Sequence, residues 1–394
     1  MKKEGTSILA NMMIWFGAGI SIAEIITGTY IAPLGFKKGV LAILLGHFIG
    51  GLVMFLAGLI SARLNKSAME SVKISYGENG GKFFSILNVI QLVGWTAIMI
   101  YDGAMSANEI FANGTWFWAL MIGILIVLWI KVGIKNLGKI NFVAMGGLFI
   151  LTIILSKIIF INSSVSQYVP AEMISFGFAV ELSAAMPLSW LPVIGDYTKD
   201  SENSVLGTFV SVVSYNVISI WMFLIGMGSA IFTGESDIAN IFLKAGLGII
   251  GLLVVVFSTV TTTFLDAFSS GVSAKSIFKN LDEKYTGIAV AIIGTILAII
   301  FPMDNITDFL FFIGSVFAPM IAIVFVDFYI FNNDYSNTQI SKLNFLIWIV
   351  GFLVYRYLLN FETVLGNTFP DILITMIIAF VVKKLASYFL VTKR

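Results

Sequence analysis

Long stretches of this chain carry no charged side chain, and this feature restricts the folds open to it more than any other. Residues 246–258 and 287–301 contain no Asp, Glu, Lys or Arg, and each lies in an apolar stretch long enough to cross a bilayer. Only 11% of the 394 residues are charged, against about 25% in a typical water-soluble chain. Because so few charges cannot cover a surface in water, the outer surface must face lipid. We therefore predict an all-α membrane protein with a single transmembrane domain.

The apolar pattern predicts twelve membrane-spanning helices. The N-terminal apolar segment has no small-residue cleavage site, so we interpret it as the first span and not as a signal peptide. Residues 61–82 predict a short amphipathic helix on the cytoplasmic surface. The predicted spans are 8–32, 39–62, 82–109, 115–132, 139–161, 172–196, 204–232, 246–274, 286–302, 306–331, 343–360 and 370–391.

The orientation follows from the basic residues, because Lys and Arg concentrate on the cytoplasmic side of membrane proteins. With the N-terminus inside, eighteen of the 23 Lys and Arg residues fall in cytoplasmic segments. Both termini are therefore predicted to be cytoplasmic, with the protein in the plasma membrane. The other five basic residues are Lys37, Lys38, Lys157, Lys244 and Arg356.

Several classes of chemistry are excluded by residue content. Cysteine is absent, which excludes disulfides and thiolate sites, and a single histidine, His47, excludes a His-cluster metal site. No GxxxxGK[ST] sequence occurs, so we expect an ion gradient to drive transport and not ATP. A membrane-embedded enzyme would need a catalytic constellation, whereas the intramembrane carboxylates are scattered over four spans. An ion channel would need a repeated filter sequence, which this chain lacks.

Two predicted spans are interrupted near their centres. The first contains FGAG at residues 16–19, and the sixth contains MPLSWLP at residues 186–192. Irregular backbone is tolerated at membrane depth only where it lines a cavity, and transporters bind their substrates there. Alternatively, the glycines permit close packing and the prolines only kink their helix. Interruptions five spans apart favour a substrate site built from two five-helix repeats.

The eighth span carries a row of hydroxyl groups. Ser258, Thr261 and Thr262 stand at i, i+3 and i+4, so they share one helix face. Hydroxyl oxygens opposite the free carbonyls of an unwound helix suit a hard cation such as Na⁺. The alternative is that these side chains bond back to carbonyls of their own helix.

Four acids fall inside predicted spans, and an intramembrane carboxylate is costly unless it faces a cavity or a partner. Glu24, Asp102 and Glu181 lie in the outer half, while Asp266 lies in the inner half and continues the hydroxyl face. A carboxylate can accept from the exocyclic amine of an aminopyrimidine. Glu24 is the acid that we expect to do so, with Glu181 second; a protonated structural acid is the alternative for each of the four.

The third span offers a stacking plane. Trp95 lies near its middle, beside Gly94, and Gln91 stands four residues earlier, so an indole and an amide share one face. We expect Gly94 to let a flat ligand approach the helix, and an amide can both donate to and accept from a heteroaromatic edge. Other residues read as interfacial anchors, namely Trp15, Trp116, Trp118 and Trp348, and His47 and Arg356 read as structural.

These features resemble the nucleobase:cation symporter-1 family. The likeness rests on QLVGW at 91–95, Asp196-Tyr197 ending the sixth span, the Thr-rich eighth span leading to SSG at 269–271, and Pro319 followed by VDFY at 326–329. It covers nearly the whole chain. Within the family, the chain most resembles the CytX-type permeases associated with hydroxymethylpyrimidine, a thiamin precursor.

The resemblance implies a LeuT-type fold with two inverted repeats, about 8–161 and 172–331, and two extra helices within 343–391. It places the substrate between the broken spans one and six and spans three and eight. Trp95 matches the family's stacking residue, Gln91 its amide partner and Ser189 a substrate contact. Sodium ligands are implied at the side chains of Thr261 and Thr262 and the carbonyls of Phe16 and Gly19.

Some positions depart from the family pattern. Ser258 stands where cytosine permeases of this family have Asn, which preserves an oxygen ligand. Pro187 falls where an aromatic residue is usual, so Trp190 is expected to stack instead. Glu24 and Asp266 have no counterpart in those permeases, which argues against cytosine itself as the substrate.

We therefore expect a cation-coupled secondary-active importer of a pyrimidine, with hydroxymethylpyrimidine as the leading substrate and cytosine or a purine as the alternative. Na⁺ is the expected coupling ion, with H⁺ as the alternative, and no cofactor or nucleic-acid partner is expected. The candidate substrate-binding residues are Trp95, Gln91, Gly94, Ser189, Trp190, Ser21, Glu24, Glu181 and Asp266, and the candidate sodium ligands are Phe16, Gly19, Ser258, Thr261 and Thr262.

Overall fold

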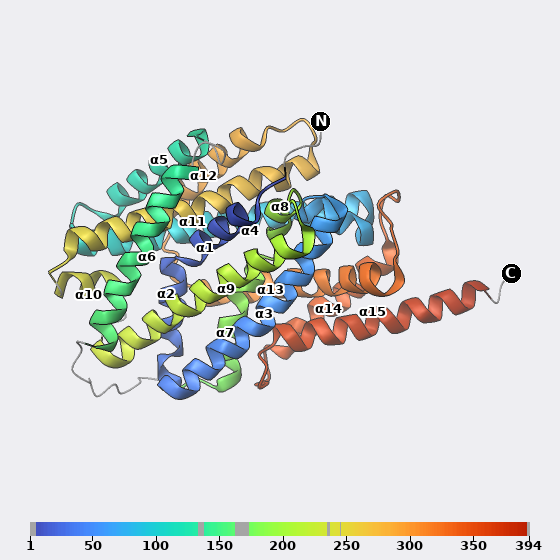
Figure 1. Ribbon diagram of the computed structural model, residues 1–394. Helices are drawn as coiled ribbons and strands as arrows, with labels where there is room; N and C mark the ends of the chain where they lie inside the picture. Colours follow the sequence, from blue (N-terminus) through green and yellow to red (C-terminus); the bar gives the residue numbers. More distant parts are fainter. Residues whose placement is uncertain (1–4, 133–137, 162–172, 235–236, 245, 392–394) are drawn as a thin grey trace.

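A computed structural model describes residues 5–132, 138–161, 173–234, 237–244 and 246–391 of the chain, and regular structure within these ranges is helical apart from one bridge between Thr6 and Ser201. Figure 1 shows the helices as a bundle, with the last helix, α15, projecting beyond it. The helices are α1 (Ile8–Gly19), α2 (Ile22–Ile31), η1 (Ala32–Leu34), α3 (Phe36–Leu64), α4 (Ala68–Ile110), α5 (Thr115–Val132), α6 (Gly138–Phe160), α7 (Phe176–Ser189), α8 (Ile194–Thr198), α9 (Ser204–Gly228), η2 (Ser229–Thr233), α10 (Ile238–Lys244), α11 (Gly248–Ile277), α12 (Glu283–Ile300), α13 (Ile306–Phe325), η3 (Val326–Phe331), α14 (Lys342–Leu358) and α15 (Thr368–Val391).

Seven helices of the described residues are long and apolar enough to cross a membrane, and the bent pair α1–α2 makes an eighth if it is counted as one span. Each of the twelve predicted spans coincides with a helix or with two helices separated by a short break. The all-α membrane architecture is therefore confirmed.

The packing of the first five spans recurs in the next five. Helix α1 of the first span packs on α9 of the seventh. The equivalent pair, α7 of the sixth span and α3 of the second, also packs together. In the same way α6 packs on α11 and α13 packs on α4, while α4 and α11 pack along each other. The limits of the two repeats, residues 8–161 and 172–331, stay a prediction.

Both predicted interruptions are present. The first lies at Ile20 and Ser21, where α1 and α2 meet at an angle of 54°. The second follows Ser189, where α7 ends two residues after Pro187 and the chain turns before α8 begins. Proline has no amide hydrogen and disturbs the helix around it, which explains why α7 stops here.

The predicted amphipathic helix is joined to the third span. Residues 68–76 form the first part of α4, and the kink is at Gly77, whose φ of 77° is in the left-handed region. Beyond the kink, the amides of Glu78 and Asn79 donate to the carbonyls of Thr338 and Gln339, at 2.9 and 2.8 Å. A Cβ atom at position 77 would lie 2.7 Å from the Thr338 carbonyl oxygen, so only glycine fits there.

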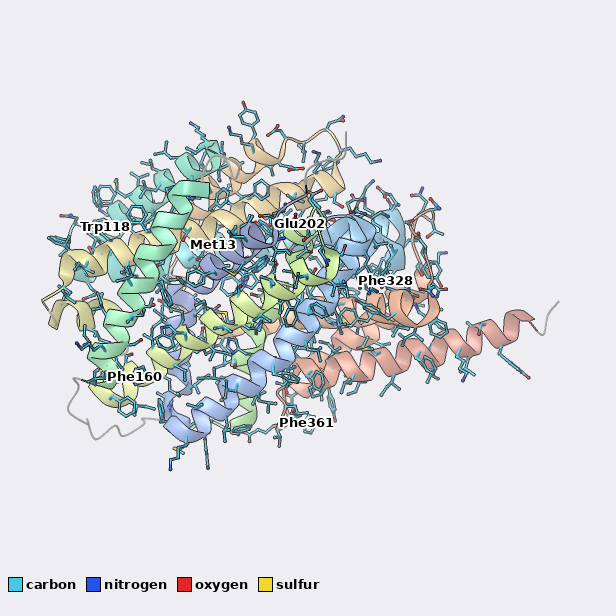
Figure 2. The ribbon with its side chains drawn as sticks, viewed as in Figure 1. Met13, Trp118, Phe160, Glu202, Phe328 and Phe361 are labelled. Carbon is cyan, nitrogen blue, oxygen red and sulfur yellow. The ribbon has the colours of Figure 1, made fainter. Side chains whose placement is uncertain are left out.

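Residues near alternate span ends gather on opposite sides of the bundle. Figure 2 shows Trp118, Phe160 and Phe361, near ends predicted to be extracellular, at the left and bottom of the bundle. Glu202 and Phe328, near ends predicted to be cytoplasmic, lie to the upper right. Glu202 also accepts a hydrogen bond from the first amide of α1, Ile8, at 3.1 Å, which fixes where the first span begins.

Candidate substrate and cation site

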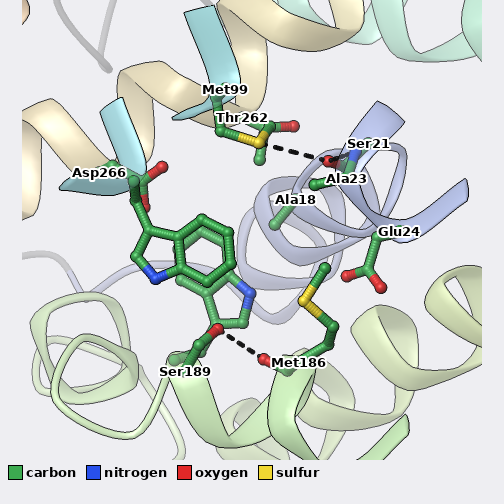
Figure 3. Close-up of a pocket in the computed structure, with 11 residues that line it drawn as sticks. Ala18, Ser21, Ala23, Glu24, Met99, Met186, Ser189, Thr262 and Asp266 are labelled. Carbon is green, nitrogen blue, oxygen red and sulfur yellow. Dashed lines mark hydrogen bonds between the residues drawn. The ribbon is translucent and has the colours of Figure 1, made fainter. Parts of the chain in front are cut away.

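A cavity lies where the two broken spans face α4 and α11. Figure 3 shows Ser21, Met99, Thr262 and Asp266 toward one side of it, and Met186 and Ser189 toward the other. Its lining therefore comes from spans one, three, six and eight, as the family resemblance implied. The lining residues are Ala18, Ser21, Ala23, Glu24, Trp95, Met99, Met186, Ser189, Trp190, Thr262 and Asp266.

The backbone at the first break leaves the helical hydrogen-bond ladder. The amide of Ile20 donates to the Gly17 carbonyl, and the amide of Ala23 donates to the Ser21 hydroxyl at 3.2 Å. Ser21 thus caps α2, while the last carbonyls of α1 point toward the break without the amide partners of a continuous helix. The C-terminal end of α1, which carries partial negative charge, suits a cation, and the N-terminal end of α2 suits an acceptor.

Two tryptophans border the cavity from different helices. Trp95 of α4 is buried, its ring packs edge-on against Phe309 at 5.3 Å, and its Nε1 has no hydrogen-bond partner among the described residues. Trp190, at the end of α7, packs edge-on against Trp15 and Tyr215 at 5.3 and 6.1 Å. Two aromatic residues held this way can offer faces to a planar ring.

Two predicted interfacial anchors lie inside the protein instead. Trp15 is fully buried in the aromatic group beside Trp190, and Trp348 is buried against Phe83 and Phe84. The prediction was wrong for both, because the rotation of each helix in the bundle, and not depth alone, decides what a tryptophan meets. Trp116 is 58% exposed, as expected of an anchor.

Gly94 does not face the cavity. A Cβ atom there would lie 2.6 Å from the ring of Phe309, so the missing side chain makes room for α13 and not for a ligand. Gln91 lies deeper in the same helix; its amide donates to Asn88 Oδ1 at 2.7 Å, and its Oε1 has no partner among the described residues. The predicted role of Gly94 is therefore incorrect, and Gln91 is not among the residues that line the cavity.

Asp266 of α11 is the acid most open to the cavity. It is 4% exposed, and its carboxylate has no hydrogen-bond partner in the part of the chain that the structure describes. A buried polar group without a hydrogen-bond partner is unfavourable. A ligand in the cavity that donates to this carboxylate would supply the partner.

Glu24 and Glu181 are both engaged with the protein. Glu24 borders the cavity, but its oxygens accept from Tyr215 at 2.5 Å and from Ser219 at 2.7 Å. Glu181 does not line the cavity: it accepts from the hydroxyls of Tyr355 and Thr368 and from two amides that begin α15. The prediction that Glu181 contacts substrate is contradicted, because its carboxylate caps a helix of the C-terminal pair.

The hydroxyl row of α11 divides into two groups. Thr262 Oγ1 lies 3.3 Å from the Ile20 carbonyl at the first break. The Ser258 hydroxyl donates to the Val255 carbonyl, and the Thr261 hydroxyl donates to the carbonyls of Phe257 and Ser258. Both hydroxyls are therefore hydrogen-bonded within α11. Ser258 also lines a smaller hollow together with Ile20 and Ser21. Of the predicted sodium ligands on α11, Thr262 is therefore the one whose hydroxyl contacts the first break, and the carbonyl that it contacts belongs to Ile20.

Some residues of the site were missed by sequence analysis. Met99 and Met186 line the cavity, and the Met99 sulfur lies 3.8 Å from the Ser21 hydroxyl. Methionine adapts to irregular ligands, but sixteen methionines in an apolar chain leave no signal that selects these two. Tyr215 and Ser219 were missed because their partner, Glu24, lies about two hundred residues away in sequence.

Comparison with known proteins shows which family this chain matches. A family described as "Permease for cytosine/purines, uracil, thiamine, allantoin" matches residues 2–365. The cytosine permease of Escherichia coli strain K12 is 21% identical over 348 residues, which cover 87% of this chain and 82% of that protein. The putative purine-cytosine permease YxlA of Bacillus subtilis strain 168 is 24% identical over 351 residues, covering 80% of this chain and 74% of YxlA.

Solved structures share the fold. Mhp1, described as a nucleobase-cation-symport-1 family transporter, in a closed conformation with bromovinylhydantoin bound, matches with a TM-score of 0.78 at 16% identity, over 95% of this chain and 92% of its own. Its inward-facing conformation gives 0.79 at 15% identity, over 98% and 92%. A Na⁺-coupled sialic acid symporter gives 0.70 at 12% identity, over 94% and 88%.

Proposed function

Because this chain belongs to the family of permeases for cytosine/purines, uracil, thiamine and allantoin, we propose that it is a cation-coupled importer of a pyrimidine. The family and the shared transporter fold make it a membrane transporter of nucleobase-type compounds and not an enzyme. The substrate, the ion and the residues that bind them are part of the proposal.

The substrate ring binds between Trp95 and Trp190, and Asp266 accepts from an exocyclic amine. The observation that carries this assignment is the unpartnered Asp266 carboxylate in a cavity that lies at both helix breaks and is bordered by Trp95 of α4 and Trp190. An acidic acceptor selects a ligand with a polarised N–H group, and stacking on an indole selects a flat ring. Ser21 and Ser189 offer further hydroxyls, although Ser189 Oγ donates to the Met186 carbonyl at 2.7 Å.

Hydroxymethylpyrimidine is the leading substrate. It combines an aromatic ring, a ring-nitrogen acceptor and an exocyclic amine. It is placed first because the sequence most resembles the CytX-type permeases, which are associated with this compound. Cytosine or a purine is the second candidate, because curated relatives over most of the chain are named for those compounds.

Sodium is proposed to bind beside the first break. Thr262, with Ser258 and Thr261, supplies hydroxyls, and the backbone around Phe16, Gly19 and Ile20 supplies carbonyls. Oxygen ligands of this kind suit a hard monovalent cation. The protein is further proposed to lie in the plasma membrane with both termini cytoplasmic, as the Lys and Arg distribution predicts.

Uptake into reconstituted vesicles tests the function. Labelled hydroxymethylpyrimidine should accumulate when a sodium gradient is imposed, and a panel of unlabelled pyrimidines and purines should rank the substrates by competition. Accumulation of cytosine or a purine alone would replace the leading substrate with the second. Failure of every compound to enter or compete would refute pyrimidine import.

A further inference from the structure

The only histidine of the chain belongs to a buried hydrogen-bonded network that reaches the cavity. His47 of α3 is 1% exposed; its Nε2 lies 2.6 Å from Ser219 Oγ of α9, which lies 2.7 Å from Glu24 Oε2 of α2. On the other side of the ring, His47 Nδ1 lies 2.7 Å from Ser183 Oγ of α7 and 3.0 Å from the Ile43 carbonyl.

Two glycines bring these helices close enough for the network to form. A Cβ atom on Gly46 would lie 2.5 Å from Ser183 Cβ, and one on Gly28 would lie 2.4 Å from the Phe223 carbonyl. Larger residues would therefore separate α3 from α7 and α2 from α9. The network is built into the packing of four helices and does not depend on a surface loop.

The contacts around Nδ1 decide which ring nitrogen carries hydrogen. The Ile43 carbonyl can only accept, and Ser183 Oγ also lies 2.8 Å from that carbonyl. A hydroxyl has one hydrogen to donate. When Nδ1 carries hydrogen, it can donate toward Ser183 or Ile43 while Ser183 donates to Ile43. Without that hydrogen, at least one of the three contacts joins two acceptors, so the geometry favours a protonated Nδ1.

The protonation state of His47 determines that of Glu24, because Ser219 bonds to both side chains. If His47 is neutral with its hydrogen on Nδ1, then Nε2 must accept the single hydrogen of Ser219. Ser219 then has none left for Glu24, so Glu24 must be a carboxylic acid that donates to Ser219. If His47 is instead an imidazolium, Nε2 donates to Ser219 and Ser219 donates to an ionised Glu24. Both arrangements supply a hydrogen to the His47–Ser219 contact and to the Ser219–Glu24 contact, and both hold one more proton than an ionised Glu24 beside a neutral His47.

We propose that Glu24, Ser219 and His47 form a proton-binding site that opens on the substrate cavity and exchanges one proton during the transport cycle. Glu24 and His47 hold this proton jointly, and Ser219 relays it between them. Because Glu24 lies on the second half of the broken span, any motion of α2 against α9 acts directly on the hydrogen bonds that retain the proton.

Few other titratable groups face this network. From α9, Tyr215 donates to Glu24 Oε1, and from α11, Asp266 lines the opposite part of the cavity. Glu181 of α7 is held by Tyr355 and Thr368. Asp102 belongs to α4, and Lys37 and Lys38 lie at the distant start of α3.

Nuclear magnetic resonance of His47 tests the site without any substrate. Because the chain has one histidine, full-length protein labelled with ¹⁵N-histidine and purified on a histidine-free tag gives the signals of a single ring. At the lower pH values, the ring should be protonated at Nδ1, either as the neutral form or as the imidazolium. As the pH rises and Glu24 ionises, Ser219 must turn toward Glu24, and the ring hydrogen should move to Nε2.

Three variants separate a shared proton from a structural histidine. In Glu24→Gln, the amide donates permanently to Ser219, so the Nδ1–H form should persist at all pH values. In Ser219→Ala, the position of the hydrogen on the His47 ring should no longer depend on the ionisation of Glu24. Ser211→Ala is the matched control, because Ser211 is a buried residue of α9 that donates only to its own helix at Gly207, and it should switch as wild type does. A neutral Nε2–H ring at all pH values, or an unchanged switch in Glu24→Gln, would overturn the proposal.

Proton movement during transport is the second measurement, and it rests on the proposed function. Vesicles with a pH indicator inside should acidify as a labelled pyrimidine enters through wild type or Ser211→Ala. Glu24→Gln and Ser219→Ala should lose this acidification. Uptake by wild type without acidification would overturn proton exchange, whereas absence of uptake beside a normal His47 switch would refute the pyrimidine assignment alone.

Discussion

Thr262 Oγ1 lies 3.3 Å from the carbonyl oxygen of Ile20, so the hydroxyl face of α11 meets the first break where its backbone leaves the helical pattern. The two residues are 242 positions apart in sequence. This contact joins the proposed cation site to the substrate cavity, because Thr262 lines that cavity as well.

Thr262→Ala should reduce the effect of sodium on substrate affinity. Coupling between two sites is reciprocal and typically amounts to about 1–3 kcal/mol, and the substitution removes an oxygen that faces the break. Binding of labelled substrate, measured in sodium and in choline buffer, gives the coupling. Thr263→Val is the control, because the Thr263 hydroxyl is buried on the same helix without a partner among the described residues. Equal coupling in wild type and Thr262→Ala would remove Thr262 from the cation site.

Trp95→Ala should weaken substrate binding by about 1–3 kcal/mol, on the scale of stacking between an aromatic side chain and a base. Trp95→Phe should retain part of that energy, because a smaller ring still offers a face. Trp116→Ala is a suitable comparison, since Trp116 is exposed at the start of α5. Calorimetric titration of folded, detergent-purified protein measures the change, and an unaltered affinity in Trp95→Ala would disprove stacking.

Asp266→Asn should lower affinity for aminopyrimidines more than for ring analogues that lack the amine. A site that bonds a polar group rejects analogues without it strongly, and the Asp266 carboxylate has no competing partner in the described residues. Glu24→Gln is the informative comparison, because the Glu24 oxygens already bond Tyr215 and Ser219. A selective loss in Glu24→Gln, with none in Asp266→Asn, would return amine recognition to Glu24.

Lys383→Met should destabilise the protein by about 3–5 kcal/mol, the usual cost of leaving one member of a buried ion pair alone. Lys383 bonds to Asp327, which also accepts from Asn333 and Asn344 at 3.0 and 2.9 Å. Lys384→Met is the matched control, since the neighbouring lysine is exposed. Thermal unfolding in detergent compares the variants, and similar midpoints for the two would show that the ion pair contributes little.

The sequence predicted the features that depend on residue type and on spacing within a single helix. Glycines and prolines marked both breaks, and the spacing of Ser258 and Thr262 placed hydroxyls on the face that reaches the first one. The position of Trp95 in its span also identified a residue that borders the cavity. Each of these inferences needed only helix periodicity and backbone chemistry.

The remaining features depend on how helices rotate against one another. Gly94 meets Phe309 and Trp15 meets Trp190 because of packing between distant spans. Glu181 finds its partners 186 and 187 residues later, at the start of α15. A single sequence contains no information on such pairings, so a mid-span acid or histidine identifies a group that needs a partner but not the partner itself.

The kink at Gly77 has a mechanical consequence. The start of the third span is tethered to residues 338 and 339, in the connection that leads from η3 to α14. A tilt of α4 must pull this connection along, and α14 is then displaced in the same direction. A cut in this connection should therefore uncouple α14 from α4 while leaving the cavity lining intact.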